Sequence, residues 1–106
     1  MDLTEYKHQV IDAASAGDNT VVRAIPGKRI VVTALYLVST SANTLQFRTG
    51  TTGNDLTGGM ALAANGVLEA GYHPDGHFAT VAGDLLNLRL SGGTSVDGWL
   101  TYRVVA

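Results

Sequence analysis

The sequence contains no cysteine among its 106 residues, so neither a disulfide nor a thiolate zinc site can form. A domain of this length buries only about two thirds of its unfolded surface, which leaves a small margin of stability. Small domains without disulfides are commonly stabilised by association with further copies. Hydrophobic residues make up 45% of the chain and charged residues 15%, which suggests that apolar surface is buried between subunits. We therefore expect a homo-oligomer.

Clusters of basic residues are also lacking. The seven Lys and Arg residues are scattered and the net charge is -2, so no long-range field draws the protein onto nucleic acid. The N-terminus has no basic region followed by an apolar stretch, and no apolar run approaches the roughly 18 residues that span a bilayer. We expect neither nucleic acid nor a membrane as a partner, and a protein that stays in solution where it is made.

The motifs of common enzymes are missing as well. No Gly-x-Ser-x-Gly elbow, no thiol nucleophile and no Gly-Lys-Ser/Thr phosphate loop occurs. Most carboxylates lie in or near turns, where an Asp side chain binds nearby backbone amides. These carboxylates are Asp55, Glu69, Asp75, Asp84 and Asp97. We expect a protein without catalytic residues or cofactors.

Two histidines frame the one segment that resembles a metal site. His73 and His77 lie four residues apart with Asp75 between them, whereas His8 is isolated. A His pair at this spacing converges on a metal when it sits on a helix, but Pro74 and Gly76 favour a turn here. We interpret the segment as a turn and predict no metal site.

Short β-type segments separated by turn residues fill the chain from Glu5 to Val105. Leu86, Leu88 and Leu90 alternate with polar residues, as in a strand with one wet side. Asn65-Gly66 favours a two-residue hairpin, and residues 26–28 form a second predicted hairpin turn. About eight strands at this spacing predict an antiparallel sandwich or barrel. The predicted strands cover residues 6–14, 20–25, 29–39, 45–48, 60–64, 67–72, 78–81, 86–90 and 96–105.

The segment Arg29–Ser39 is the longest predicted strand and has hardly a polar residue. Both of its faces must therefore be covered, either by a second sheet or by a neighbouring subunit. We expect the second possibility to involve five residues: Ile30, Val32, Leu35, Tyr36 and Leu37.

Aromatic residues are few, but they could form a platform for stacking sugars if several were exposed on one face. The candidates are Tyr6, Tyr36, Tyr72, Trp99 and Tyr102. Because amphipathic rings are normally highly buried, we expect them to pack in the core and at strand edges.

Several turns and strand starts resemble those of small β-sandwich virion proteins of tailed bacteriophages. The likeness covers most of the chain from Thr20 onward. It rests on residues 26–30, 47–51, 56–66, 74–78, 83–88 and 96–102.

This resemblance implies an all-β fold, a single antiparallel jelly-roll-like sandwich over residues 19–106. It also implies a homotrimer that binds the major capsid protein on the outside of the phage head. Such a decoration or cement protein is made in the host cytoplasm and stabilises the expanded head without catalysis, by binding only that state. A tail or receptor-binding component that recognises host surface glycan is the alternative.

Residues 1–18 match nothing in this family pattern. In decoration proteins the N-terminal segment often forms a docking arm, and an ordinary edge strand is the other interpretation. The arm would contact the capsid through seven residues: Asp2, Leu3, Thr4, Glu5, Tyr6, Lys7 and His8.

Overall fold

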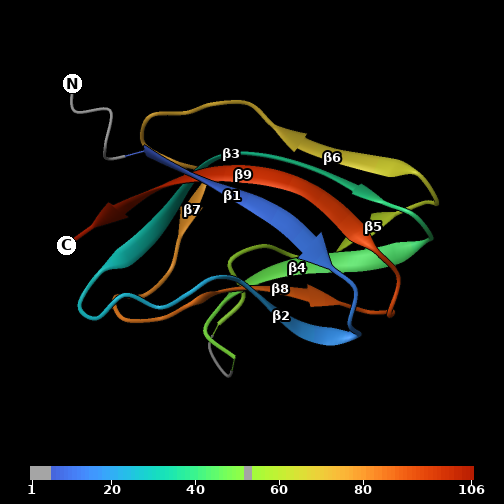
Figure 1. Ribbon diagram of the computed structural model, residues 1–106, viewed down its shortest axis with the longest axis horizontal. Helices are drawn as coiled ribbons and strands as arrows, with labels where there is room; N and C mark the ends of the chain where they lie inside the picture. The colour runs from blue at the N-terminus through green and yellow to red at the C-terminus, as the bar shows by residue number, and fades with distance from the viewer. Residues whose placement is uncertain (1–5, 52–53) are drawn as a thin grey trace.

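The computed structural model describes residues 6–51 and 54–106, which form nine β-strands packed as two antiparallel sheets (Figure 1). No helix occurs in this part of the chain, and hence none that could cross a membrane. The predicted all-β sandwich is therefore confirmed. The strands are β1 (Tyr6–Ala13), β2 (Gly17–Val22), β3 (Arg29–Ser39), β4 (Asn43–Thr49), β5 (Met60–Leu62), β6 (Gly66–Ala70), β7 (Phe78–Ala79), β8 (Leu86–Leu90) and β9 (Val96–Val105).

The connectivity is that of a jelly roll. One sheet has the strand order β1-β9-β3-β6, with the two-residue β7 also paired to β3, and the other has the order β2-β8-β4-β5. The chain crosses repeatedly between the layers, so most strands pair with strands that are distant in sequence, whereas β5 pairs with the preceding strand β4 (Figure 1). The alternating strand β8 thus lies between β2 and β4, and the apolar strand β3 lies between β9 and β6.

The core lies between the two sheets and follows the period-two alternation of the strands. Leu86, Leu88 and Leu90 of β8 point inward, as predicted, and Leu45 and Phe47 of β4 meet them from the next strand. Phe47 is the largest of the fully buried side chains. Its ring lies 5.1 Å from that of Phe78, which closes one end of the core. The apolar content that suggested subunit contacts is thus used largely within one chain.

Strand β3 shows why the predicted interface residues need correction. Its pairing with β9 shifts register between Val32 and Ala34, so one extra residue, Thr33, bulges out of the ladder. The bulge lets residues on either side of it share the inward face. Four of the residues assigned to a subunit interface are therefore buried in the core of the single chain, and only Tyr36 points outward. The four are Ile30, Val32, Leu35 and Leu37.

Both predicted hairpins connect the two sheets instead of joining paired strands. Residues 25–28 do form a turn, with a hydrogen bond from the Lys28 amide to the Ile25 carbonyl and a φ of 69° at Gly27, but β2 and β3 lie in different sheets. Likewise Asn65, with a φ of 62°, forms a turn closed by the Gly66 amide, between β5 of one sheet and β6 of the other. A turn forms at each predicted place, but neither is a hairpin, and the central residues of the second turn are Ala64 and Asn65, since Gly66 already belongs to β6.

Strand β1 is an edge strand of its sheet, paired with β9 from Tyr6↔Arg103 to Ala13↔Val96. It also contributes Ile11 and Ala13 to the core, so it is an integral part of the sandwich. The predicted capsid contacts divide accordingly. Tyr6, Lys7 and His8 belong to β1, whereas Asp2, Leu3, Thr4 and Glu5 lie outside the described residues.

Candidate functional site: the outer face of the β1-β9-β3-β6 sheet

The outward side chains of the β1-β9-β3-β6 sheet form an exposed apolar surface, which we call the aromatic face. Val10 of β1, Trp99 of β9 and Tyr36 of β3 are cross-strand neighbours, and Val38 and Val67 extend the surface onto β6. Val10 is 61% exposed, Val67 49% and Trp99 39%. Large apolar side chains on the surface are unremarkable singly, but a contiguous group of them is typical of a binding surface.

Stacked rings form the centre of the aromatic face. The Trp99 ring lies 6.3 Å from that of Tyr36 and 6.2 Å from that of His8, with interplanar angles of 14° and 26°. At one end of the face Tyr72 donates a hydrogen bond to the Tyr6 hydroxyl at 2.9 Å, and this bond raises the pKa of Tyr72. Of the five predicted aromatics, only Tyr102 is buried in the core. The expectation that these rings pack in the core and at strand edges is therefore wrong for Trp99 and Tyr72, which are 39% and 58% exposed.

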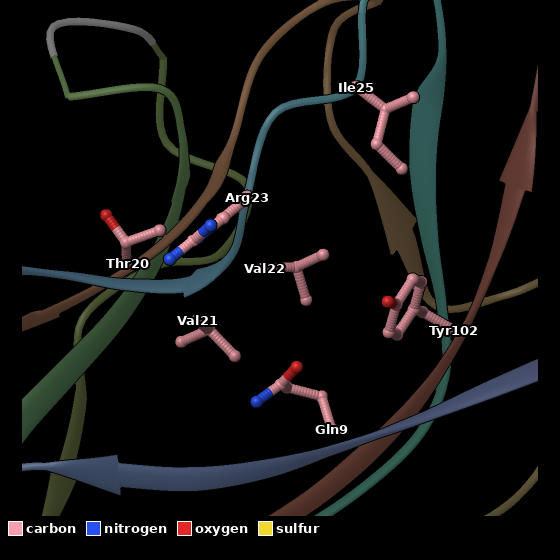
Figure 2. A pocket seen from close by; sticks show the side chains of 7 residues that line it. All are labelled: Gln9, Thr20, Val21, Val22, Arg23, Ile25 and Tyr102. Atoms are coloured by element: carbon pink, nitrogen blue, oxygen red, sulfur yellow. The ribbon is translucent and has the colours of Figure 1, made fainter.

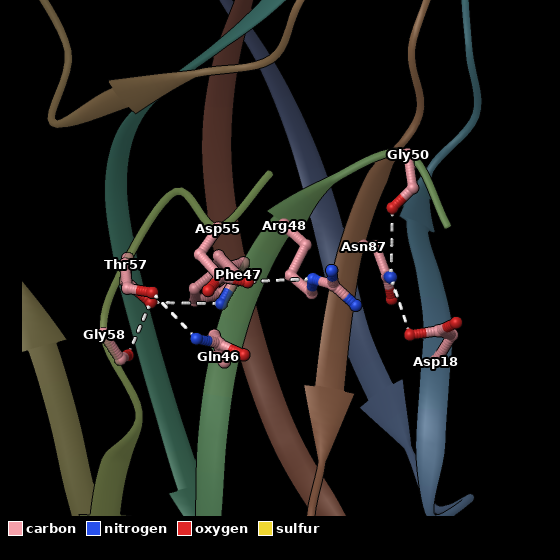
Figure 3. A network of polar contacts seen from close by, with 9 residues as sticks. All are labelled: Asp18, Gln46, Phe47, Arg48, Gly50, Asp55, Thr57, Gly58 and Asn87. Carbon is pink, nitrogen blue, oxygen red and sulfur yellow. Dashed lines mark hydrogen bonds and ion pairs between the residues drawn. The ribbon is translucent and has the colours of Figure 1, made fainter. Parts of the chain in front are cut away.

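The outer face of the other sheet is polar and provides a contrast within the same molecule. Asn87 of β8 is fully buried there, where its side-chain amide donates to Asp18 Oδ1 at 2.9 Å and to the Gly50 carbonyl at 3.1 Å (Figure 3). Arg48 of β4 forms an ion pair with Asp55, with 2.9 Å between Nε and Oδ1 (Figure 3). These side chains form hydrogen bonds and an ion pair within the chain, so this face has less to gain from a partner.

Two carboxylates meet directly at one end of the aromatic face. Asp12 of β1 and Asp97 of β9 are cross-strand partners in the ladder. Partial desolvation, followed by the hydrogen bond to Asp12 and its negative charge, raises the pKa of Asp97. Like charges directly opposite each other on a sheet are destabilising when both are ionised. The pair is therefore a local cost to the folded chain at neutral pH.

We expect Asp97→Asn to stabilise the single folded chain, measured at protein concentrations too low for copies to associate, by on the order of 0.5 kcal/mol at about pH 7, because the amide removes one of the two opposed charges. The raised pKa of Asp97 means that the folded state holds its proton more tightly than the unfolded state. The stability due to this group is thus present below the unfolded value of 3.8 and is lost as pH rises through the raised value.

Urea unfolding of both proteins across the acid range tests this expectation. The gain from Asp97→Asn should shrink as pH falls, since the wild-type pair then becomes protonated. Equal gains at acid and neutral pH would contradict it. Asp75→Asn is a suitable control because Asp75 lies in an exposed turn away from this pair.

A groove of about 570 Å³ lies on the open side of the sandwich, between β1 and the strand and loop of residues 20–25 (Figure 2). Its polar groups are those of Gln9, Thr20, Arg23 and Tyr102, and Val21, Val22 and Ile25 supply its apolar wall. Among the described residues, the lining of this groove includes neither a carboxylate nor a histidine.

The predicted turn at residues 73–76 is confirmed by the hydrogen bond from the Gly76 amide to the His73 carbonyl. The side chains of His73 and His77 are used locally. Nδ1 of His73 accepts from the Asp75 amide at 3.2 Å, and Nε2 of His77 lies 2.6 Å from the Gly71 carbonyl oxygen. Among the described residues no group of three potential metal ligands comes together.

Sequence reasoning missed Val10, Val67 and the pair Asp12–Asp97 as parts of one surface. A signal for one of them, Asp97, was present in β9, where Val96, Leu100 and Tyr102 lie at alternate positions of the strand and are buried. The intervening positions hold Asp97, Trp99 and Arg103, which places the tryptophan on the outside with two charged residues. No such signal exists for Val67, since its place beside Val38 depends on a long-range pairing.

The jelly-roll strand order and the exposed aromatic face are the two features of this molecule that a comparison with known proteins can use. No family model, no curated protein and no solved structure gives a significant match to the chain.

Proposed function

We propose that this protein is a non-enzymatic virion subunit of a tailed bacteriophage, which decorates the surface of the expanded head and stabilises it. The observation that carries the proposal is the aromatic face on an otherwise self-sufficient jelly roll. A β-sandwich with a filled core and one exposed apolar sheet has the properties of a building block that is completed by association.

In this proposal the protein stabilises the expanded head because it binds that state in preference to the precursor. A subunit that binds the expanded shell and not its precursor favours the expanded state by RT ln(1 + [L]/Kd), about 2.7 kcal/mol at a hundredfold excess over Kd. Association of copies, which the resemblance implies to be three, multiplies weak contacts with the major capsid protein through effective concentration. The subunit is made in the bacterial cytoplasm and acts on the assembled head.

The test mixes the purified protein with expanded heads of its own phage that lack it, followed by cryo-electron microscopy. We expect ordered density at symmetry axes and heads that withstand higher temperature. Uniformly bare heads would contradict the proposal. A chain lacking residues 1–5 tests the arm, because β1 begins at Tyr6 and is left complete. Full occupancy by the shortened chain would exclude an essential contact by Asp2, Leu3, Thr4 or Glu5.

A glycan-binding tail or receptor-binding component is the second candidate, and the exposure of Trp99 next to Tyr36 favours it. Aromatic rings with one exposed side are typical of surfaces that stack sugars. Titration of Trp99 fluorescence with glycans of the host surface should then show saturable quenching. Bare heads together with such quenching would favour this candidate over decoration.

A further inference from the structure

The aromatic face has a polarity along its strands. At one end lie the carboxylates Asp12 and Asp97, and at the other lie Arg103 of β9 and Arg29 of β3. The apolar residues Val10, Trp99 and Tyr36 lie between the two ends, and the exposed Glu69 of the edge strand β6 continues their row beside Tyr36. Because outward residues of adjacent strands align in rows, the charges of opposite sign are separated by the aromatic centre and do not pair with each other.

Among the described residues, no side chain of opposite charge forms an ion pair with either end, although Nε of Arg29 donates to the Thr80 carbonyl at 3.1 Å. Over residues 6–51 and 54–106 the one ion pair is Arg48–Asp55, which belongs to the polar face. Nε of Arg103 is buried and has no hydrogen-bond partner among these residues. At the other end Asp12 and Asp97 face each other without a cation. The acidic end thus has no cation as a partner among the described residues, and the opposite end carries two arginines that could supply one.

We propose that a second copy of this chain packs on the aromatic face, related by a two-fold axis that lies parallel to the sheet and perpendicular to its strands. This rotation reverses the strand direction, so the Asp12–Asp97 end of each copy meets the Arg103 end of the other. The interface is isologous and closes on itself. This inference shares with the proposed function only the expectation that copies of the chain associate. It predicts two copies in the assembly, where the resemblance implies three.

The size of the face agrees with a small interface of this kind. Strand β9 has ten residues, about 33 Å at roughly 3.3 Å per residue, and the outer two of four strands about 4.8 Å apart are about 14 Å from each other. The projected area of the face is thus about 460 Å², smaller than the roughly 800 Å² per partner in standard interfaces and in the range of weaker ones. Trp and Tyr at the centre, with charged residues toward the rim, are the usual composition of such a patch.

A charge exchange tests the pairing. Arg103→Glu gives a face with two acidic ends, and Asp97→Lys gives a face with a cation at both ends. Each variant alone should dissociate at least tenfold more readily than the wild type, because like charges then meet across the interface. An equimolar mixture should recover two-chain particles, since each acidic end then meets a basic one. Arg89→Glu, on the polar face, is the matched control and should pair like the wild type.

Sedimentation velocity and native mass spectrometry read out the result, with circular dichroism to verify folding. Should Arg103→Glu fail to fold, Trp99→Ala replaces it and should also give single chains. A wild type that is a single chain or three chains, or a mixture that gives no two-chain particles from folded variants, would overturn the inference. If the wild type forms two-chain particles but leaves the heads bare, only the decoration proposal is contradicted. If it decorates the heads but is a single chain in solution, only the pairing is contradicted.

Discussion

Gly98→Ala is expected to destabilise the fold by about 3 kcal/mol or more, because a side chain at this position meets backbone and not another side chain. Gly98 of β9 pairs with Leu37 of β3, the contact between the two central strands of the sheet. An added Cβ would overlap the Tyr36 carbonyl oxygen and lie 2.7 Å from Leu37 Cα. The strands must separate to accommodate it, and this breaks the ladder at its most protected point.

Gly71→Ala is the matched control for this substitution, because a Cβ added at Gly71 meets nothing within 4 Å. Urea unfolding at one fixed protein concentration, so that association contributes equally, gives the comparison. A Gly98→Ala protein within about 0.5 kcal/mol of the Gly71→Ala protein would show that the two strands are held less closely than described.

Phe47→Ala is expected to cost about 3–5 kcal/mol, the range for removal of a fully buried aromatic side chain. Phe47 lies at the centre of the core and is in contact with Phe78, so its loss leaves a cavity that the two sheets cannot close without moving. At about 4–8 °C per kcal/mol for a domain of this size, the midpoint of thermal unfolding should fall by at least 12 °C.

Tyr36→Ala is the control for Phe47→Ala, since it removes an aromatic ring from the outside of the sandwich instead of the inside. We expect its thermal midpoint to fall far less, with the main effect on association. If the two substitutions cost the same, the core as described between the sheets would be incorrect.

The sequence predicts the strands of this fold better than their partners. The bounds of β3 and the inward leucines of β8 follow from local pattern, because alternation reports burial directly. Whether a turn joins paired strands or crosses between sheets depends on remote pairing. The turns at Gly27 and Asn65 therefore had the predicted chemistry and a different topological role.

The candidate site shows the same division. The parity of β9 places Trp99 outside, and this could be predicted from the strand alone. The inward direction of Leu35 and Leu37 together with Ile30 depends on the bulge at Thr33, which no local residue pattern indicates. The meeting of Asp12 with Asp97 requires the pairing of the first strand with the last.

This pairing has a consequence for how the chain reaches its native state. Strand β9 lies between β1 and β3, so β1 cannot join the sheet until the segment Val96–Val105 has been synthesised. A ribosome adds residues at about 5–20 per second, and β1 stays without its ladder for that interval. Topologies dominated by such remote pairings fold slowly, in milliseconds to seconds. The β1-β9-β3-β6 sheet therefore forms only after the last strand has been synthesised. A chain interrupted before β9 would leave exposed the apolar strands that the complete molecule buries.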